Sequence, residues 1–244
     1  TADQLDKLRQ GDLAGCFGPL FSGLGIKQPL TIPGNRMRLV HRVNEIIPHG
    51  GRYGQGMIRA EADIHPDDWF ITCHFVDDRV MPGTLMYECC MHTLRILLLR
   101  IGWVAEASHG VWEPVPGVAS KLCCRGQVLE TTKVVTYEVT IREIGYRPEP
   151  YVIVDALMYA DGKPIVEITS MSARLTGTTR NDLELLWNMR SEKRHEEGGM
   201  AGARSAATET YQLDRRGSEH RATNQTALRS SFSKPAIYTK EQIL

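Results

Sequence analysis

The sequence predicts an α+β fold in which an antiparallel sheet wraps around one long central helix. Two observations predict it: stretches between residues 134 and 176 have the residue pattern of β-strands, and residues 83–101 carry apolar side chains at helical spacing. A helix that is apolar almost all round must be buried, and antiparallel strands supply its cover. The chain has 244 residues, of which 42% are hydrophobic, so it is long enough to build such a core.

Five segments favour strands. The clearest alternate apolar and polar residues, whereas one is apolar on nearly both faces, as expected of a central strand. Asp161-Gly162 is typical of a hairpin turn between the last two. The expected strands are Met37–Ile46, Gly54–Ile64, Val134–Arg142, Tyr151–Tyr159 and Pro164–Leu175.

The helix is expected from Gly83 to Ile101, with Pro82-Gly83 as its entry. Its apolar residues recur on a broad face, so we expect it to be buried. These residues are Leu85, Met86, Cys89, Cys90, Thr93, Leu94, Leu97 and Ile101.

The sequence divides into four parts. Residues 1–178 form the domain with an N-terminal extension, and residues 179–190 form a short helix with Asp182 as its N-cap. Residues 191–235 are poor in large apolar side chains, which predicts a disordered linker. Residues 236–244 repeat the Thr-x-x-Gln pattern of residues 1–5, which predicts the start of a following unit in a longer multidomain protein.

Composition excludes several function classes. The 29 basic and 29 acidic residues cancel, which argues against a nucleic-acid binder that relies on bulk positive charge. No apolar run approaches the roughly 20 residues of a membrane span, and the N-terminus lacks a signal-peptide pattern. The six cysteines include no C-x-x-C, so we expect small buried hydrophobes in a reducing cytoplasm, with no structural zinc and no disulfide.

The segment Trp69–Glu88 carries the chemistry. A helix that begins at Gly83 presents unpaired N–H groups, and glycine lets a thioester carbonyl approach that backbone closely. His74 lies just upstream and is suited to act as a base near neutral pH. Glu88 places a charge on an apolar helix, so it should be paired or functional. Taken singly, His74 also fits a core histidine and Glu88 a carboxylate favoured by the helix dipole.

The combination resembles the FabA/FabZ-type 3-hydroxyacyl-[acyl-carrier-protein] dehydratases, which have the hot-dog fold. Their motif is His-Phe, an acidic loop, Met-Pro-Gly, and an acidic residue 14 positions after the histidine. Here the motif is His74-Phe75, Met81-Pro82-Gly83 and Glu88. The resemblance covers roughly residues 5 to 177 and is greatest to the dehydratase domains of polyunsaturated fatty acid synthases and polyketide megasynthases.

The resemblance implies a role for each residue. His74 would remove the C2 proton, and Glu88 would help expel the C3 hydroxyl, directly or through water. The amide of Gly83, with that of Thr84, would hold the thioester oxygen, and the Val80 carbonyl would fix the tautomer of the imidazole. Met86 and Tyr87 would line the acyl tunnel.

The resemblance also implies partners. The substrate would arrive on the phosphopantetheine of an acyl carrier protein, with no metal or organic cofactor of the enzyme's own. Domains of this family pair, so we expect a homodimer or a pseudo-dimer with an adjacent hot-dog domain. Basic residues that would meet an acidic carrier protein are Lys121, Arg125, Arg142 and Arg147, although a plain solvated charged surface is the more ordinary interpretation of them.

Three positions depart from the family pattern. Arg79 replaces a proline, which puts the rigidity of the loop in doubt, Met86 replaces a small residue, and His41 stands where an aspartate is common. For His65 and His92 a plain surface or core role is expected. Two alternatives to a dehydratase remain open: a hot-dog acyl thioesterase, and a non-catalytic structural hot-dog unit of a megasynthase.

Overall fold

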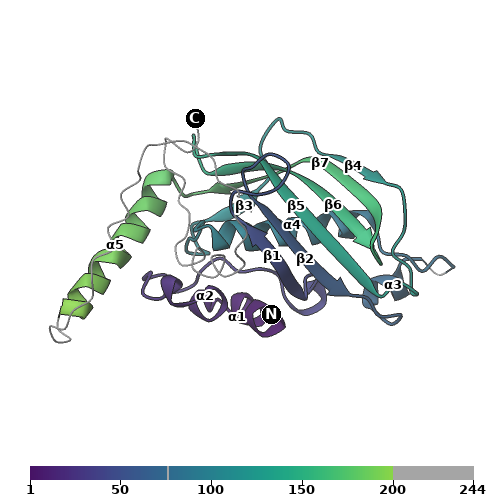
Figure 1. Ribbon diagram of the computed structural model, residues 1–244, viewed down its shortest axis with the longest axis horizontal. Helices are drawn as coiled ribbons and strands as arrows, with labels where there is room; N and C mark the ends of the chain where they lie inside the picture. Colours follow the sequence, from purple (N-terminus) through teal and green to yellow (C-terminus); the bar gives the residue numbers. More distant parts are fainter. Residues whose placement is uncertain (76, 200–244) are drawn as a thin grey trace, which may run out of the picture.

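The architecture is a curled antiparallel sheet with one long helix along its concave face (Figure 1). The computed structural model describes residues 1–75 and 77–199. Seven strands pair in the order β1-β2-β5-β6-β7-β3, and β4 also pairs with β7. The strands are β1 (Arg42–Ile47), β2 (Met57–Asp63), β3 (Val111–Glu113), β4 (Lys121–Cys124), β5 (Val134–Gly145), β6 (Tyr151–Ala160) and β7 (Lys163–Thr176).

Helices flank this sheet and connect its strands. The long central helix α4 (Gly83–Arg100) is buried along most of its length and contacts β2, β5, β6 and β7. The predicted α+β fold is therefore confirmed. The other helical elements are α1 (Ala2–Arg9), α2 (Leu13–Phe17), α3 (Trp69–Cys73), α5 (Arg180–Gly199) and the short 3₁₀ turns η1 (Pro19–Phe21) and η2 (Asn35–Met37).

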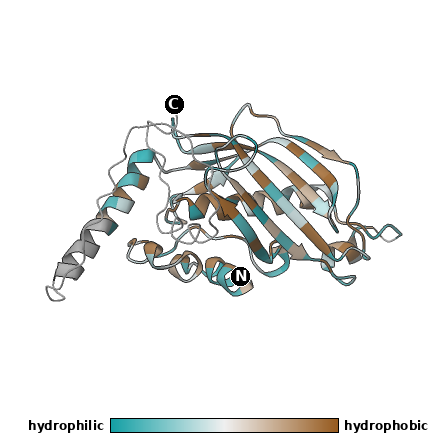
Figure 2. Cartoon of the chain, in the orientation of Figure 1, coloured by the Kyte–Doolittle hydropathy of each residue, from teal (hydrophilic) through white to brown (hydrophobic). Residues whose placement is uncertain are grey.

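The strands follow the predicted alternation. In β2, Ile58, Ala60 and Ala62 are buried while their neighbours are partly exposed, and the same alternation of hydropathy is visible along the sheet in Figure 2. The central position of β6 is confirmed, because it pairs with β5 on one side and β7 on the other. Asp161 and Gly162 both have positive φ and form the predicted hairpin turn.

The first expected strand was placed too early. Residues 35–37 form a 3₁₀ turn, and β1 begins only at Arg42. In the segment between them, backbone carbonyls bind side chains instead of a neighbouring strand: Arg9 donates to the Val40 carbonyl and Tyr137 to the Leu39 carbonyl. These contacts tie the N-terminal helices to the sheet.

The N-terminal segment begins with a capping box. The Thr1 hydroxyl accepts from the Gln4 backbone amide, and the Gln4 side-chain oxygen accepts from the Thr1 amino group. The Thr-x-x-Gln pattern at residues 1–5 is thus a helix start. Its counterpart at residues 236–244, and the part of the predicted linker from residue 200 to 235, lie outside the described residues.

The C-terminal helix differs from its predicted bounds. It begins at Arg180, and Thr179 rather than Asp182 is its cap, because Thr179 and Asp182 bond reciprocally across the first turn. It continues to Gly199, beyond the predicted end at 190, since Lys, Arg and Glu favour helices even without apolar neighbours. None of the described helices is both long and apolar enough to cross a membrane.

This helix also packs on the domain rather than following it as a separate unit. Leu183 and Trp187 are buried, and the Trp187 indole donates to the Gly102 carbonyl. Arg190 donates to the carbonyls of Pro19 and Ser22. The boundary predicted at residue 178 therefore falls too early for the folded domain.

Trp187→Ala should lower the free energy of unfolding by about 3–5 kcal/mol, because it empties a buried site and removes an indole hydrogen bond. Leu185→Ala on the same helix is the matched control, since Leu185 is 58% exposed and its loss should change stability by no more than about 0.5 kcal/mol. Urea unfolding of both variants measures the difference, and equal losses would contradict the packing of α5.

Candidate active site

His74 is held by a two-way contact with Val80. It follows directly after α3, and its Nδ1 lies 3.1 Å from the Val80 carbonyl oxygen. In return, the Val80 amide donates to the His74 carbonyl at 3.0 Å. Because a carbonyl oxygen can only accept, the neutral imidazole carries its proton on Nδ1 and leaves Nε2 free to accept one. This is the contact that the family resemblance implies.

The loop between His74 and Val80 is anchored by Arg79. Its guanidinium donates to the Pro66 carbonyl at 2.6 Å and pairs with Glu130 at 2.7 Å. These contacts tie the loop to both neighbouring segments, so Arg79 supplies an anchor where the family pattern has a proline. The Phe75 ring, which is 59% exposed, lies against the imidazole with 3.9 Å between ring centroids.

The start of α4 comes three residues after Val80. The Met81 amide donates to the Val128 carbonyl, which holds the chain in place just before the helix. The amides of Leu85 and Met86 both donate to the Pro82 carbonyl. Gly83 and Thr84 are the first two residues of the helix, so their amides have no acceptor within it. Thr84 is exposed. The positive end of the helix dipole therefore lies on the same short segment that holds His74.

The chain itself does not require glycine at position 83. Gly83 has no positive φ, and a Cβ placed there would lie 3.6 Å from the Cys124 sulfur and 4.0 Å from Leu122, which are ordinary contacts. Alanine would therefore fit the fold. What a Cβ would occupy is the space beside the first amides of α4.

Glu88 lies in the second turn of α4 and pairs with His92 one turn further on. The Glu88 carboxylate is 3.4 Å from Nε2 of His92, and the two side chains are 41% and 3% exposed. The hydrogen bond from His92 lowers the pKa of Glu88, and partial burial opposes this effect. The carboxylate is thus ionised at neutral pH in the single chain.

A cavity of about 270 Å³ lies beside Glu88, between α4, β3 and β7. Tyr87 lines it with Glu88, together with Met91, Arg95 and Trp112. The Tyr87 hydroxyl is 3.1 Å from that of Ser120. Met86 instead lies in the hydrophobic core at 3% exposure, so Met91 is the methionine beside the cavity.

The expected residues form two separate groups. His74, Val80, Gly83 and Thr84 share one short segment, whereas Glu88 and Tyr87 face the cavity toward β3. No contact recorded among the described residues joins His74 to Glu88. The catalytic roles of His74 and Glu88 therefore stay predictions.

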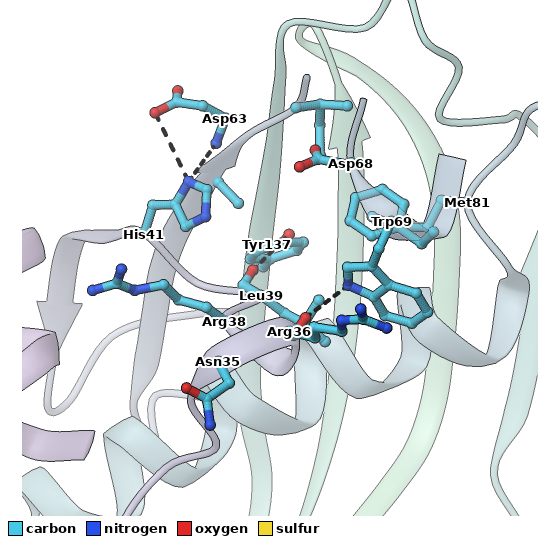
Figure 3. Close-up of a pocket in the computed structure, with 13 residues that line it drawn as sticks. Asn35, Arg36, Arg38, Leu39, His41, Asp63, Asp68, Trp69, Met81 and Tyr137 are labelled. Carbon is cyan, nitrogen blue, oxygen red and sulfur yellow. Dashed lines mark hydrogen bonds and ion pairs between the residues drawn. The ribbon is translucent and has the colours of Figure 1, made fainter. Parts of the chain in front are cut away.

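His41 lines a second cavity, of about 210 Å³ (Figure 3). The Asp63 amide donates to His41 Nδ1 at 3.0 Å, and burial lowers the pKa of His41. The Trp69 indole, on α3, donates to the Arg36 carbonyl across the same cavity. His41 is therefore a hydrogen-bonded neutral side chain at the position where the family commonly has an aspartate.

The predicted basic residues differ in their surroundings. Arg142 pairs with Asp155 and bonds to Ser170, while Arg125 lies 3.9 Å from Glu167. Lys121 is exposed on β4, the strand whose Leu122 and Cys124 lie nearest to Gly83. Lys121 thus lies near the start of α4.

The cysteines only partly match their predicted burial. Cys16, Cys89 and Cys90 are buried, whereas Cys73 and Cys124 are exposed and Cys123 is intermediate, because these three lie at the end of α3 and on the edge strand β4. In the described ranges, no cluster of three or more His, Cys, Asp or Glu side chains is suited to hold a metal ion.

Sequence reasoning gave His92 a plain surface or core role and did not single out Arg95 or Trp112, although all three lie around Glu88. His92 and Arg95 lie four and seven positions after it, which is the spacing of one helix face, and this signal was available in the sequence. Trp112 could not be found in this way, because only the pairing of β3 with β7 brings it to the cavity.

Comparisons with known proteins place the chain in a family. A family model described as a FabA-like domain matches residues 32–169, more than half of the chain. Similar solved structures include a hypothetical thioesterase with coenzyme A from Streptococcus pneumoniae TIGR4, with 11% identity and a TM-score of 0.40, covering 57% of this chain and 87% of that one. The dehydratase heterocomplex ApeI:P from Xenorhabdus doucetiae also matches, with 11% identity and a TM-score of 0.40, covering 64% of this chain and 93% of that one.

His92→Leu should raise the pKa of Glu88, because it removes the hydrogen bond that lowers it and leaves the opposing effect of burial in place. Carboxyl carbon-13 NMR titration measures this pKa, and Glu88→Gln assigns the signal by deleting it. His65→Leu, at an exposed position, is the control and should leave the Glu88 titration unchanged. An unchanged or lower pKa in His92→Leu would contradict the pairing.

Proposed function

The chain belongs to the FabA-like domain family, whose hot-dog fold is shared by dehydratases and thioesterases, and we propose that it is a dehydratase. It converts 3-hydroxyacyl thioesters on an acyl carrier protein to 2-enoyl thioesters in fatty acid or polyketide biosynthesis. The observation that carries this proposal is the contact between His74 Nδ1 and the Val80 carbonyl, which leaves Nε2 as a base beside the start of α4.

The proposed reaction balances as follows. Nε2 of His74 takes the C2 proton, and the amides of Gly83 and Thr84 stabilise the charge that develops on the thioester oxygen. The C3–O bond then breaks, Glu88 supplies a proton to the departing oxygen directly or through water, and the C2=C3 double bond forms. Water leaves, and the proton returns from His74 to Glu88 through solvent.

Glu88 needs a change of environment for its acid role. In the single chain its pKa is lowered by His92, so the carboxyl group is rarely protonated at neutral pH. A substrate that excludes water from this half-buried side chain raises the pKa, because burial disfavours the charged form. We therefore assign proton donation by Glu88 to the substrate-bound state.

The absence of a hydrogen bond or ion pair between His74 and Glu88 among the described residues supports a site shared between two hot-dog units. β3 and β4 form one edge of the sheet, on the side where Glu88 faces its cavity and Gly83 faces β4. An open edge is suited to pair with a second sheet. In this arrangement His74 of one protomer meets Glu88 of its partner, in a homodimer or with an adjacent domain. The carrier protein delivers the acyl group, and the exposed Lys121 on β4, next to Leu122 beside Gly83, is suited to meet its acidic surface.

A thioesterase is the second candidate, and one observation favours it. An ionised Glu88 can activate a water molecule, which is the chemistry of thioester hydrolysis. The products separate the two reactions, because dehydration gives enoyl absorbance and hydrolysis gives a free thiol.

Purified protein given a 3-hydroxyacyl thioester should produce enoyl absorbance without free thiol. His74→Ala should abolish this activity and Glu88→Gln should lower it by about 100-fold or more, since each removes one proton-transfer group. Free thiol as the main product would support the thioesterase instead, and full activity in either variant would contradict the assignment of that residue.

The same two inactive variants test whether sites are shared. Mixed and refolded together, they should recover about a quarter of the wild-type activity, because half of the dimers are mixed and each holds one intact site. A verified heterodimer that stays inactive would show that each chain builds its own site.

Gly83→Ala should fold normally yet lose about 100-fold in kcat/KM. The added Cβ makes ordinary contacts within the chain but occupies the space beside the amides that would hold the thioester oxygen. Gly34→Ala is the matched control, because its Cβ also has an ordinary 3.6 Å contact, to Arg9, away from α4. Thermal melting and kinetics of both variants measure the effect, and an active Gly83→Ala would remove Gly83 from the site.

A further inference from the structure

The contact between His74 and Val80 joins two segments that are held separately. His74 comes directly after α3, a helix with two buried residues, and Pro66 lies in the turn before that helix. Val80 instead forms an antiparallel bridge with Leu129, in the segment that leads into β5. The hydrogen bond that orients the imidazole therefore depends on how well these two segments are kept together.

The two segments diverge at one end of the sheet, where β2 pairs with β5. The Ile64 amide donates to the Lys133 carbonyl at 2.9 Å just beyond that pairing. From this bond one segment continues through Pro66 into α3, and the other leads back through Glu130. A side chain that spans Pro66 and Glu130 thus holds the segments together beyond the end of the strand pairing.

Arg79 is the side chain that makes this span. One of its guanidinium nitrogens, Nη2, donates to the Pro66 carbonyl at 2.6 Å, and the other, Nη1, pairs with the Glu130 carboxylate at 2.7 Å. The planar fork of arginine suits two acceptors on different sides. Glu130 is itself held, because it lies in a turn in which the Leu129 amide donates to the hydroxyl of the buried Thr132.

We propose that Arg79 is the positioning residue of His74. By bonding to Pro66 and Glu130, it keeps the Val80 carbonyl against Nδ1, so that the neutral imidazole holds its proton there and leaves Nε2 free to accept one. The proline of the family pattern would restrict φ at this position, whereas arginine leaves the backbone free. This chain thus replaces a backbone restriction by a side-chain link. The role rests on the proposed function in so far as His74 acts as the base.

Nitrogen-15 NMR of the histidine side chains tests this role without turnover. At about pH 8.5, roughly two units above the ordinary pKa of histidine, His74 of the wild-type protein should carry its proton mainly on Nδ1. In Arg79→Met the proton should redistribute toward Nε2, because the Val80 carbonyl no longer stays against Nδ1. His74→Ala assigns the signal by deleting it.

Glu130→Gln is the second variant, and it covers the case in which Arg79→Met fails to fold. It removes the ion pair but leaves the contact of Arg79 with Pro66, so it should shift the tautomer in the same direction by a smaller amount. With a 3-hydroxyacyl thioester, Arg79→Met should lose about tenfold or more in kcat with little change in KM. The reason is that Arg79 acts on the orientation of the base and not on substrate binding.

Arg180→Met is the matched control. Arg180 pairs with Glu184 at 2.6 Å on α5, and these two side chains are 31% and 38% exposed, close to the 44% of both Arg79 and Glu130. Its removal should leave the tautomer of His74 and kcat unchanged. A wild-type His74 protonated mainly on Nε2, an unchanged tautomer in the Arg79 and Glu130 variants, or an equal shift in Arg180→Met would each overturn the proposal.

The two measurements separate the positioning role from the proposed function. If the wild-type protein dehydrates nothing but Arg79→Met moves the proton from Nδ1 to Nε2 of His74, the positioning role stands and the dehydratase assignment fails. Dehydration with the same kcat and the same tautomer in Arg79→Met overturns the positioning role alone. A higher KM with an unchanged kcat would place Arg79 at the substrate and would also overturn it.

Discussion

The burial of α4 is the constraint on which the rest of the structure depends. Most of the residues of this helix are buried, and it lies behind the sheet in the view of Figure 2. One face of a curled sheet covers only part of such a helix. The chain ends add cover only near its C-terminal end: the Trp187 indole of α5 donates to the Gly102 carbonyl just after α4, and Phe21 packs edge-on against Trp187.

The burial of α4 also makes its polar residues costly. A carboxylate, an imidazole and a guanidinium on one face of a buried helix cost free energy unless each is satisfied. Glu88 and His92 satisfy one another, whereas Arg95 keeps an unpaired N–H. The same pairing that makes Glu88 acceptable in the fold also keeps it ionised. The proposed proton donation by Glu88 is therefore opposed by the same His92 contact that stabilises its charge in the fold.

The sequence predicted the long strands and the central helix, because these depend on local patterns, but not the short strands β3 and β4 or the helices α1, α2 and α3. Alternation in β2 and β5 and the apolar period of α4 survive in the fold. It failed where tertiary contacts decide the outcome. In the segment before β1, backbone carbonyls accept from side chains of α1 and β5 in place of a neighbouring strand. The length of α5 was predicted too short, because its polar half has helix propensity but no apolar stripe. Trp112 lies at the cavity beside Glu88 because β3 pairs with the distant strand β7, and no local pattern predicts that pairing.

The geometry of the two expected catalytic groups carries an argument about assembly. His74 is fixed by Val80 on the segment that leads into α4, and Glu88 is fixed by His92 toward β3 and the sheet edge. Each is held by a partner of its own, so neither needs the other for its position. The proposed reaction needs both groups at one substrate, and this is why we propose a site shared between two units. In that proposal the second unit pairs with the sheet edge formed by β3 and β4, because an open edge is suited to pairing.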